Sequence, residues 1–183
     1  MYQLPKLFPA FILSCLSINF YLISKEAAIL QESISGKFNS FQLFVFELNN
    51  YSSALSPLLI FIFIYATTSI IFEYLEIKKQ KASLTWIISI AFIPILIFSF
   101  SYLFLLTDFV ENADDISGKG VEDLHLFQEY TFRDIKQIGN LFWGLFYLIL
   151  IVEIKLNYDI NYFKSLVINL TPIAILLLLI KIY

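Results

Sequence analysis

Long apolar stretches restrict the fold of this chain more than any other feature. Crossing a bilayer as a helix takes about 20 apolar residues, with about 17 as the lower limit. The stretches that meet this length are 7–23, 54–75, 84–106, 138–154 and 163–180. Residues 58–64 and 173–180 are apolar on every face, whereas a membrane barrel strand alternates apolar and polar residues. We therefore expect an all-α fold, a polytopic membrane helix bundle of about five transmembrane helices.

Composition supports a membrane protein and excludes several other classes. Hydrophobic residues make up 59% of the 183 residues, more than the core of so small a soluble domain can hide. We therefore expect one membrane domain over residues 1–183, with the lipid bilayer as its main partner. The net charge of −3 and the single arginine, Arg133, leave no basic stripe for nucleic acid. Cys15 is the only cysteine, which excludes an internal disulfide or a thiolate cluster, and we expect no metal or cofactor.

The charges between the apolar stretches predict an orientation. Residues 76–81, between the second and third stretches, form a short turn that contains Lys78, Lys79 and Lys81. Basic residues concentrate in short cytoplasmic loops. The turn therefore predicts a multi-pass protein of the cell inner (plasma) membrane with a cytoplasmic N-terminus and an external C-terminus. Basic residues are equally numerous on the two sides, so the prediction rests on their density in this short turn.

Two longer polar segments, 24–53 and 108–137, then lie outside the cell. Apolar residues recur at helical spacing in both, at Phe38, Phe41, Val45 and Leu48 in the first and at Val121, Leu124, Phe127 and Tyr130 in the second. The first segment is typical of a helix that lies in the membrane interface. We expect the two segments to pack together as a small external helical cap.

The second external segment carries the candidate partner surface. Its residues are Asp114, Asp115, Glu122, Asp123 and His125. A calcium loop that starts at Asp115 would need an oxygen ligand at its fifth position and a glutamate at its twelfth, but Lys119 and Leu126 stand there. A histidine changes charge near neutral pH, so His125 beside Asp123 is a candidate pH sensor. A solvated acidic loop with a surface histidine is the simpler interpretation.

Polar side chains inside the expected spans are candidates for a pore or a helix interface. They are Tyr65, Thr68, Ser69, Glu73, Glu153 and Asn169. Tyr65, Thr68 and Ser69 share one face of the second span, and Glu73 follows near its end. Carboxylates near span ends can reach water or a lysine, and deeper amides and hydroxyls commonly form hydrogen bonds between helices. Helix packing therefore competes with a pore as the role of these residues.

No enzyme motif is present in the sequence. A hydrolase needs a nucleophile beside a base, but neither Gly-x-Ser-x-Gly nor His-Glu-x-x-His occurs, and the only histidine lies outside the spans. We therefore do not expect an enzyme. The sequence favours a non-enzymatic accessory, sensor or immunity-type protein that binds a protein partner through its external segments.

The order of spans and loops adds an analogy. The order is similar to that in immunity proteins against pore-forming colicins: helix, long outer loop, helix, basic turn, helix, outer loop, helix. This chain adds a fifth span and shares no residue motif with them. The resemblance implies a small inner-membrane defence protein, and membrane components of phage-defence systems are of the same kind. Two alternatives remain: a homo-oligomeric ion channel with Glu73 as a charge ring, and a structural subunit of a larger membrane complex.

Overall fold

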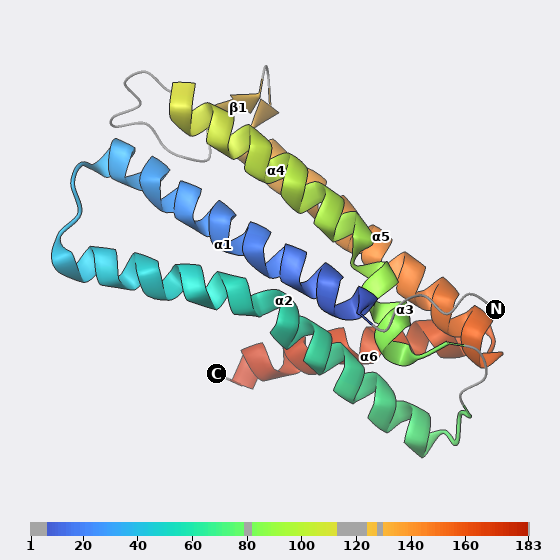
Figure 1. Cartoon of the computed structure of the whole chain (residues 1–183). Helices are drawn as coiled ribbons and strands as arrows, with labels where there is room; N and C mark the ends of the chain where they lie inside the picture. Colours follow the sequence, from blue (N-terminus) through green and yellow to red (C-terminus); the bar gives the residue numbers. More distant parts are fainter. Residues whose placement is uncertain (1–6, 79–81, 113–123, 128–129, 183) are drawn as a thin grey trace.

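Long helices run through nearly the whole of the described chain, as the apolar stretches predict. The computed structural model describes residues 7–78, 82–112, 124–127 and 130–182. For residues 112, 127 and 176–182 it describes the backbone alone. The helices are α1 (Phe8–Ser35), α2 (Ser40–Tyr74), α3 (Leu84–Ala91), α4 (Ile93–Asn112), α5 (Phe132–Tyr158) and α6 (Tyr162–Ile182). Two short strands, β1 (His125–Phe127) and β2 (Tyr130–Thr131), precede α5. The expected all-α bundle is confirmed (Figure 1).

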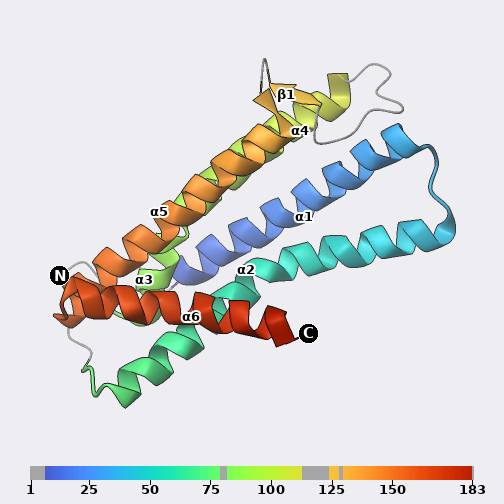
Figure 2. The same ribbon diagram turned by 180° about the vertical axis from the view of Figure 1, so that it is seen from behind.

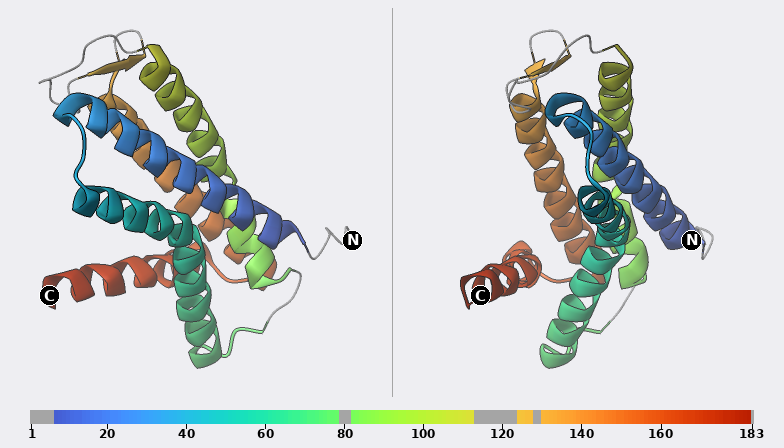
Figure 3. Two further views of the ribbon diagram at one scale, coloured as in Figure 1. Left: turned by 60° about the vertical axis from the view of Figure 1, so that its left-hand side comes forward. Right: turned by 90° about the vertical axis from the view of Figure 1, so that its left-hand side faces the viewer.

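Four helical segments of the described chain are long and apolar enough to cross a membrane. They are Phe8–Ser35, Ser40–Tyr74, Leu84–Glu111 and Phe132–Tyr158. The expected fifth span, 163–180, lies within α6. The part of α6 with described side chains, Tyr162–Ile175, is a shorter apolar helix, and α6 crosses α2 at a large angle instead of running along the bundle (Figures 1 and 3).

The first two helices are longer than the apolar stretches that predict them. The helix α1 continues to Ser35, and α2 begins at Ser40, so the helix expected through Phe41, Val45 and Leu48 is present as the start of α2. Two local signals set the ends of these helices. Gly36 ends α1 with a φ of 86°, a conformation that favours glycine. Asn39 and Gln42 then form a reciprocal capping box that starts α2.

Prolines bend two of the expected spans. The third stretch is predicted to kink at Pro94, and the structure breaks it at Phe92 into α3 and α4. Proline lacks the backbone N–H that would continue the helix ladder, which accounts for the break. Pro57 lies inside α2, which changes direction near its middle (Figure 1).

The chain before α5 forms a hairpin, which corrects the helical spacing expected there. Strands β1 and β2 pair antiparallel, with His125 opposite Thr131 and Phe127 opposite Tyr130. A helix through Leu124, Phe127 and Tyr130 is therefore wrong. The alternation of exposed His125 between buried Leu124 and Leu126 is the period of a strand, and it overrides the three-residue recurrence.

The main apolar core surrounds the short helix α3. Ile87, Ile88 and Ala91 of α3 are fully buried, and they belong to one cluster with Phe146 and Leu150 of α5. The ring of Phe92, at the break, lies 4.8 Å from the ring of Phe146. Seen from behind, α5 and α6 cover this region (Figure 2). The core therefore lies toward the end of the bundle where α3 packs against α5.

A second apolar cluster closes the opposite end. It consists of Leu30 from α1, Leu106 from α4, Leu124 and Leu126 from the hairpin, and Ile135 from α5. Phe109 and Phe132 add an edge-to-face ring contact at 5.5 Å. We call this part the capped end of the bundle. The two segments expected to pack together outside the membrane do meet here, through α1 and the hairpin.

Hydrogen bonds between polar side chains join α1 to its neighbours. The Asn19 side chain donates to the Ser99 hydroxyl of α4 at 3.0 Å, and both residues are buried. Toward the capped end, Asn49 of α2 donates to the Ser24 hydroxyl at 3.1 Å, and the Asn50 amide lies 2.7 Å from the same hydroxyl. Such contacts give specificity where every surrounding surface is apolar.

We predict that Ser99→Ala lowers the free energy of unfolding by about 1 kcal/mol, because it leaves the buried Asn19 amide without this acceptor. Reversible unfolding in detergent measures the change. Ser101→Ala is the matched control, since the Ser101 hydroxyl is exposed and donates to the Ile97 carbonyl of its own helix. Equal effects of the two substitutions would contradict a stabilising α1–α4 hydrogen bond.

Candidate functional site

The start of α5 is fixed by its cap, and this sets the position of two basic side chains. Thr131 and Asp134 form a capping box, in which the Asp134 carboxylate accepts from the Thr131 N–H at 2.9 Å and from its hydroxyl at 2.7 Å. Arg133 and Lys136 lie in the first turns of the helix that follows. They are three residues apart, so they share one face of α5.

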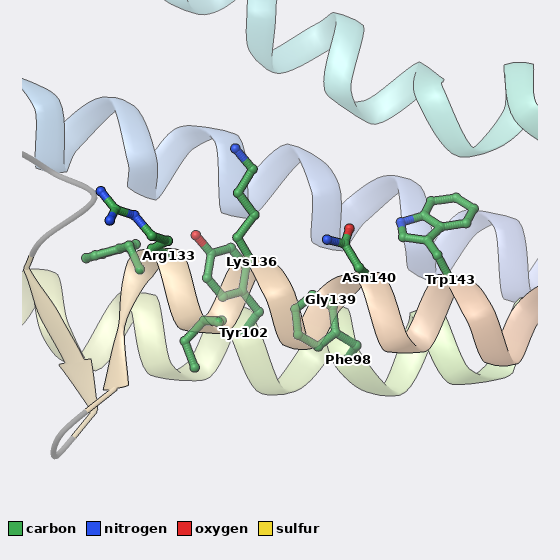
Figure 4. Close-up of a pocket in the computed structure, with 9 residues that line it drawn as sticks. Phe98, Tyr102, Arg133, Lys136, Gly139, Asn140 and Trp143 are labelled. Atoms are coloured by element: carbon green, nitrogen blue, oxygen red, sulfur yellow. The ribbon is translucent and has the colours of Figure 1, made fainter. Parts of the chain in front are cut away.

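A cavity of about 390 Å³ opens between α4 and α5 at this position. Its lining residues are Phe98 and Tyr102 from α4, and Phe132, Arg133, Ile135, Lys136, Gly139, Asn140 and Trp143 from α5. Figure 4 shows Lys136, Asn140 and Trp143 extending from the same side of α5. The Tyr102 hydroxyl points toward the end of the cavity where Arg133 and Lys136 lie.

A close approach of the two helices forms the floor of this cavity. A Cβ atom added to Gly139 would lie 3.1 Å from the Phe98 ring, so the ring occupies the space where a side chain would stand. Phe98 also stacks on Tyr102, with ring centroids 5.9 Å apart, and contacts Phe142 at 5.1 Å. The floor therefore consists of aromatic rings of α4, which contact α5 closely because Gly139 has no side chain.

A second cavity, of about 350 Å³, lies among α2, α3 and the end of α5. It brings together two of the residues expected to share a pore face, Tyr65 and Ser69, with Ser83, Thr85 and Tyr158. The third, Thr68, is fully buried, and its hydroxyl has no hydrogen-bond partner among the described residues. Within one chain, the expected face is therefore divided between a cavity wall and the core.

The remaining span candidates stay apart from both cavities. Glu73 is exposed near the end of α2. Glu153 is half-buried and accepts a hydrogen bond from the Asn157 side chain at 2.9 Å. Asn169 is buried and donates to the Ser165 carbonyl of its own helix at 2.8 Å, while its side-chain oxygen has no partner among the described residues. Each of these contacts lies within a single helix, so they hold no common site.

The external candidates are described only in part. His125 is exposed on β1, beside the buried leucines of the capped end. Asp114, Asp115, Glu122 and Asp123 lie outside the described residues. In the part of the chain that is described, no group of three or more His, Cys, Asp or Glu side chains could hold a metal ion.

The α4–α5 cavity is the feature that sequence reasoning missed. Of its lining residues, only Arg133 is named from the sequence alone, as the single arginine. A signal was present, since Arg133, Lys136, Asn140 and Trp143 follow the 3-4-3 spacing of one helix face. The contribution of α4 could not be read in the same way, because the rotation of one helix against another is set by packing.

Comparison with known proteins adds no family to these observations. The chain matches no family model, and no curated protein or solved structure matches it. Its function therefore has to be argued from its own residues.

We predict that Gly139→Ala lowers the free energy of unfolding by about 1–3 kcal/mol, because the added methyl group must displace Phe98. Gly144→Ala is the matched control on the same helix, since a Cβ there meets nothing within 4 Å. Alanine is the better helix former, so the control should be neutral or slightly stabilising. Thermal unfolding in detergent compares the two, and an equally stable Gly139→Ala would contradict the close α4–α5 packing.

Proposed function

We propose that this chain is a non-enzymatic integral protein of the cell inner membrane that acts by binding a protein partner at its capped end. The N-terminus is cytoplasmic and the capped end external, as the basic turn of residues 76–81 suggests. Accessory, sensor and immunity-type proteins all fall within this class.

The observation that carries the proposal is the construction of the capped end. Leu30 of α1, Leu106 of α4, Ile135 of α5 and two leucines of the hairpin, Leu124 and Leu126, form one buried cluster. Two hydrogen bonds to the Asp134 carboxylate fix where the hairpin passes into α5. The capped end is held in place by α1, α4, α5 and the hairpin, so it offers a defined surface. A preorganised surface loses little entropy when it binds.

Two exposed side chains give this surface its recognition chemistry. His125 is exposed on β1, and Tyr130 on β2 is 50% exposed. Tyrosine is enriched in protein interfaces because it combines a large apolar ring with a hydroxyl. The acidic residues of the proposed partner surface join this region along the chain: Asp114 and Asp115 follow α4, and Glu122 and Asp123 come just before Leu124.

The polar groups of the spans favour a binding protein over an enzyme, because several of them are used to hold helices together. Asn19, Ser99 and Ser24 are engaged in hydrogen bonds between helices, and Ser165 of α6 donates to the Ile151 carbonyl of α5 at 2.6 Å. These groups hold the helices in place. The spans thus form a scaffold, and the variable chemistry lies at the end that projects from it.

We predict that a photo-crosslinking amino acid at position 125 or 130 yields an adduct of discrete mass in cells that produce the protein. The matched control is position 141, because Leu141 is 68% exposed but lies on the apolar part of α5. Gel mobility and mass spectrometry identify the adduct. Absence of adducts at 125 and 130, or the same adducts at 141, would contradict partner binding at the capped end.

The mass of the adduct also separates the proposal from its main alternative. Adducts in multiples of 21.3 kDa would show self-association and favour the homo-oligomeric channel. Ion flux into proteoliposomes, with and without Glu73→Ala, would then be the next measurement. An adduct with a different protein would support partner binding directly.

A further inference from the structure

We propose that the cavity between α4 and α5 binds the headgroup of an anionic phospholipid, with the start of an acyl chain along its aromatic floor. The proposal is independent of the protein partner proposed above. It rests on the chemistry of the side chains along the cavity. They are cationic at one end, polar in the middle and aromatic at the other end, as the headgroup and first chain carbons of a lipid require.

The cationic end comes from Arg133 and Lys136. Both side chains are exposed and both line the cavity, and the Tyr102 hydroxyl points toward them (Figure 4). A guanidinium has five donors in a planar fork that suits phosphate oxygens, and an ammonium has three. Arg133 makes other interactions in the structure, and it has donors enough to keep a partner and still bind a phosphate oxygen.

The Asp134 carboxylate is directed away from the cavity, to the cap of α5. Asp134 lies between Arg133 and Lys136 in sequence, but its carboxylate turns back to the cap and accepts from the Thr131 N–H and hydroxyl. It is not among the residues that line the cavity. Arg133 and Lys136 therefore line the cavity, whereas the Asp134 carboxylate does not.

The apolar end begins one to two turns further along α5. Asn140 and Trp143 continue the face of Lys136, and Phe98 and Gly139 form the floor beneath them. Arg133 and Trp143 are ten residues apart, which is about 15 Å along the helix axis. An inorganic phosphate ion would use only the cationic end of this surface. A phospholipid would use all of it, with its phosphate at the end of the span and its chain toward the middle.

The position of the cavity within the helices fits this ligand. It lies at the start of Phe132–Tyr158, a helix long and apolar enough to cross a membrane, where basic side chains are expected to reach headgroup level. Basic pockets between transmembrane helices are known to bind anionic headgroups. Phosphate headgroups line both faces of a bilayer, so the inference holds for either orientation of the chain.

The test is lipid binding by the full chain, measured by native mass spectrometry after delipidation in detergent. Phosphatidylglycerol and phosphatidylcholine with identical acyl chains are the two probes, because they differ in net charge and share the phosphate and the chains. We expect the wild-type protein to bind phosphatidylglycerol about tenfold more tightly than phosphatidylcholine, and Arg133→Gln with Lys136→Gln to abolish this preference.

A charge-matched control separates this cavity from general attraction to basic residues. Lys25→Gln with Lys164→Gln also removes two positive charges, and both lysines are exposed and lie outside the cavity. This variant should keep the tenfold preference. Thermal unfolding of all three proteins in detergent micelles should remain a cooperative transition, since the four substituted side chains are exposed.

Three results would overturn the proposal. The first is equal binding of the two lipids by the wild-type protein. The second is an equal loss of preference in the two double variants. The third is displacement of phosphatidylglycerol by inorganic phosphate at a similar concentration, which would show an ion site without a role for the acyl chain. Loss of the preference in Arg133→Gln with Lys136→Gln, its retention in the control and no displacement by phosphate together support a lipid site in this cavity.

Discussion

Helices that lie in lipid gain little from apolar contact alone, because a leucine side chain meets an equally apolar neighbour in lipid and in protein. The packing of this bundle therefore depends on a few contacts that lipid cannot replace. The buried hydrogen bond from Asn19 to Ser99 joins α1 to α4, and that from Ser165 to the Ile151 carbonyl joins α6 to α5. Close approach at Gly139, where the Phe98 ring fills the place of a side chain, joins α4 to α5. These contacts fix the helix pairs on which both cavities and the capped end are built.

The sequence predicts the existence of the helices better than their ends. Hydropathy identifies the apolar part of a helix, so it found the apolar half of α1 and of α2 but not their continuation to Ser35 and from Ser40. The ends follow from local chemistry: a positive φ at Gly36 and the capping box of Asn39 with Gln42. The kink at Pro94 was predictable for the same reason, since the missing N–H of proline acts within one turn.

Contacts between helices mark the limit of what one sequence can predict. The 3-4-3 spacing from Arg133 to Trp143 defines a face of α5, but nothing in the sequence says that Phe98 and Tyr102 lie opposite that face. The same limit applies to Tyr65, Thr68 and Ser69. Their spacing places them near one another on α2, yet the structure puts Tyr65 and Ser69 on a cavity wall and buries Thr68 completely. A rotation of α2 by a fraction of a turn would exchange these roles, and only packing against its neighbours decides it.

The two ends of the bundle differ in how fully their polar groups are satisfied, and this difference bears on where the molecule can change. At the capped end, the Asp134 carboxylate and the Thr131 hydroxyl are hydrogen-bonded to each other and to the backbone, around a closed leucine cluster. Toward α3 and α6, the Thr68 hydroxyl, the Trp86 indole N–H and the Asn169 side-chain oxygen are buried with no partner among the described residues. An unpaired buried polar group costs free energy that a new hydrogen bond recovers. A shift of α2, α3 or α6 that gives these atoms partners therefore offsets part of the contacts it breaks.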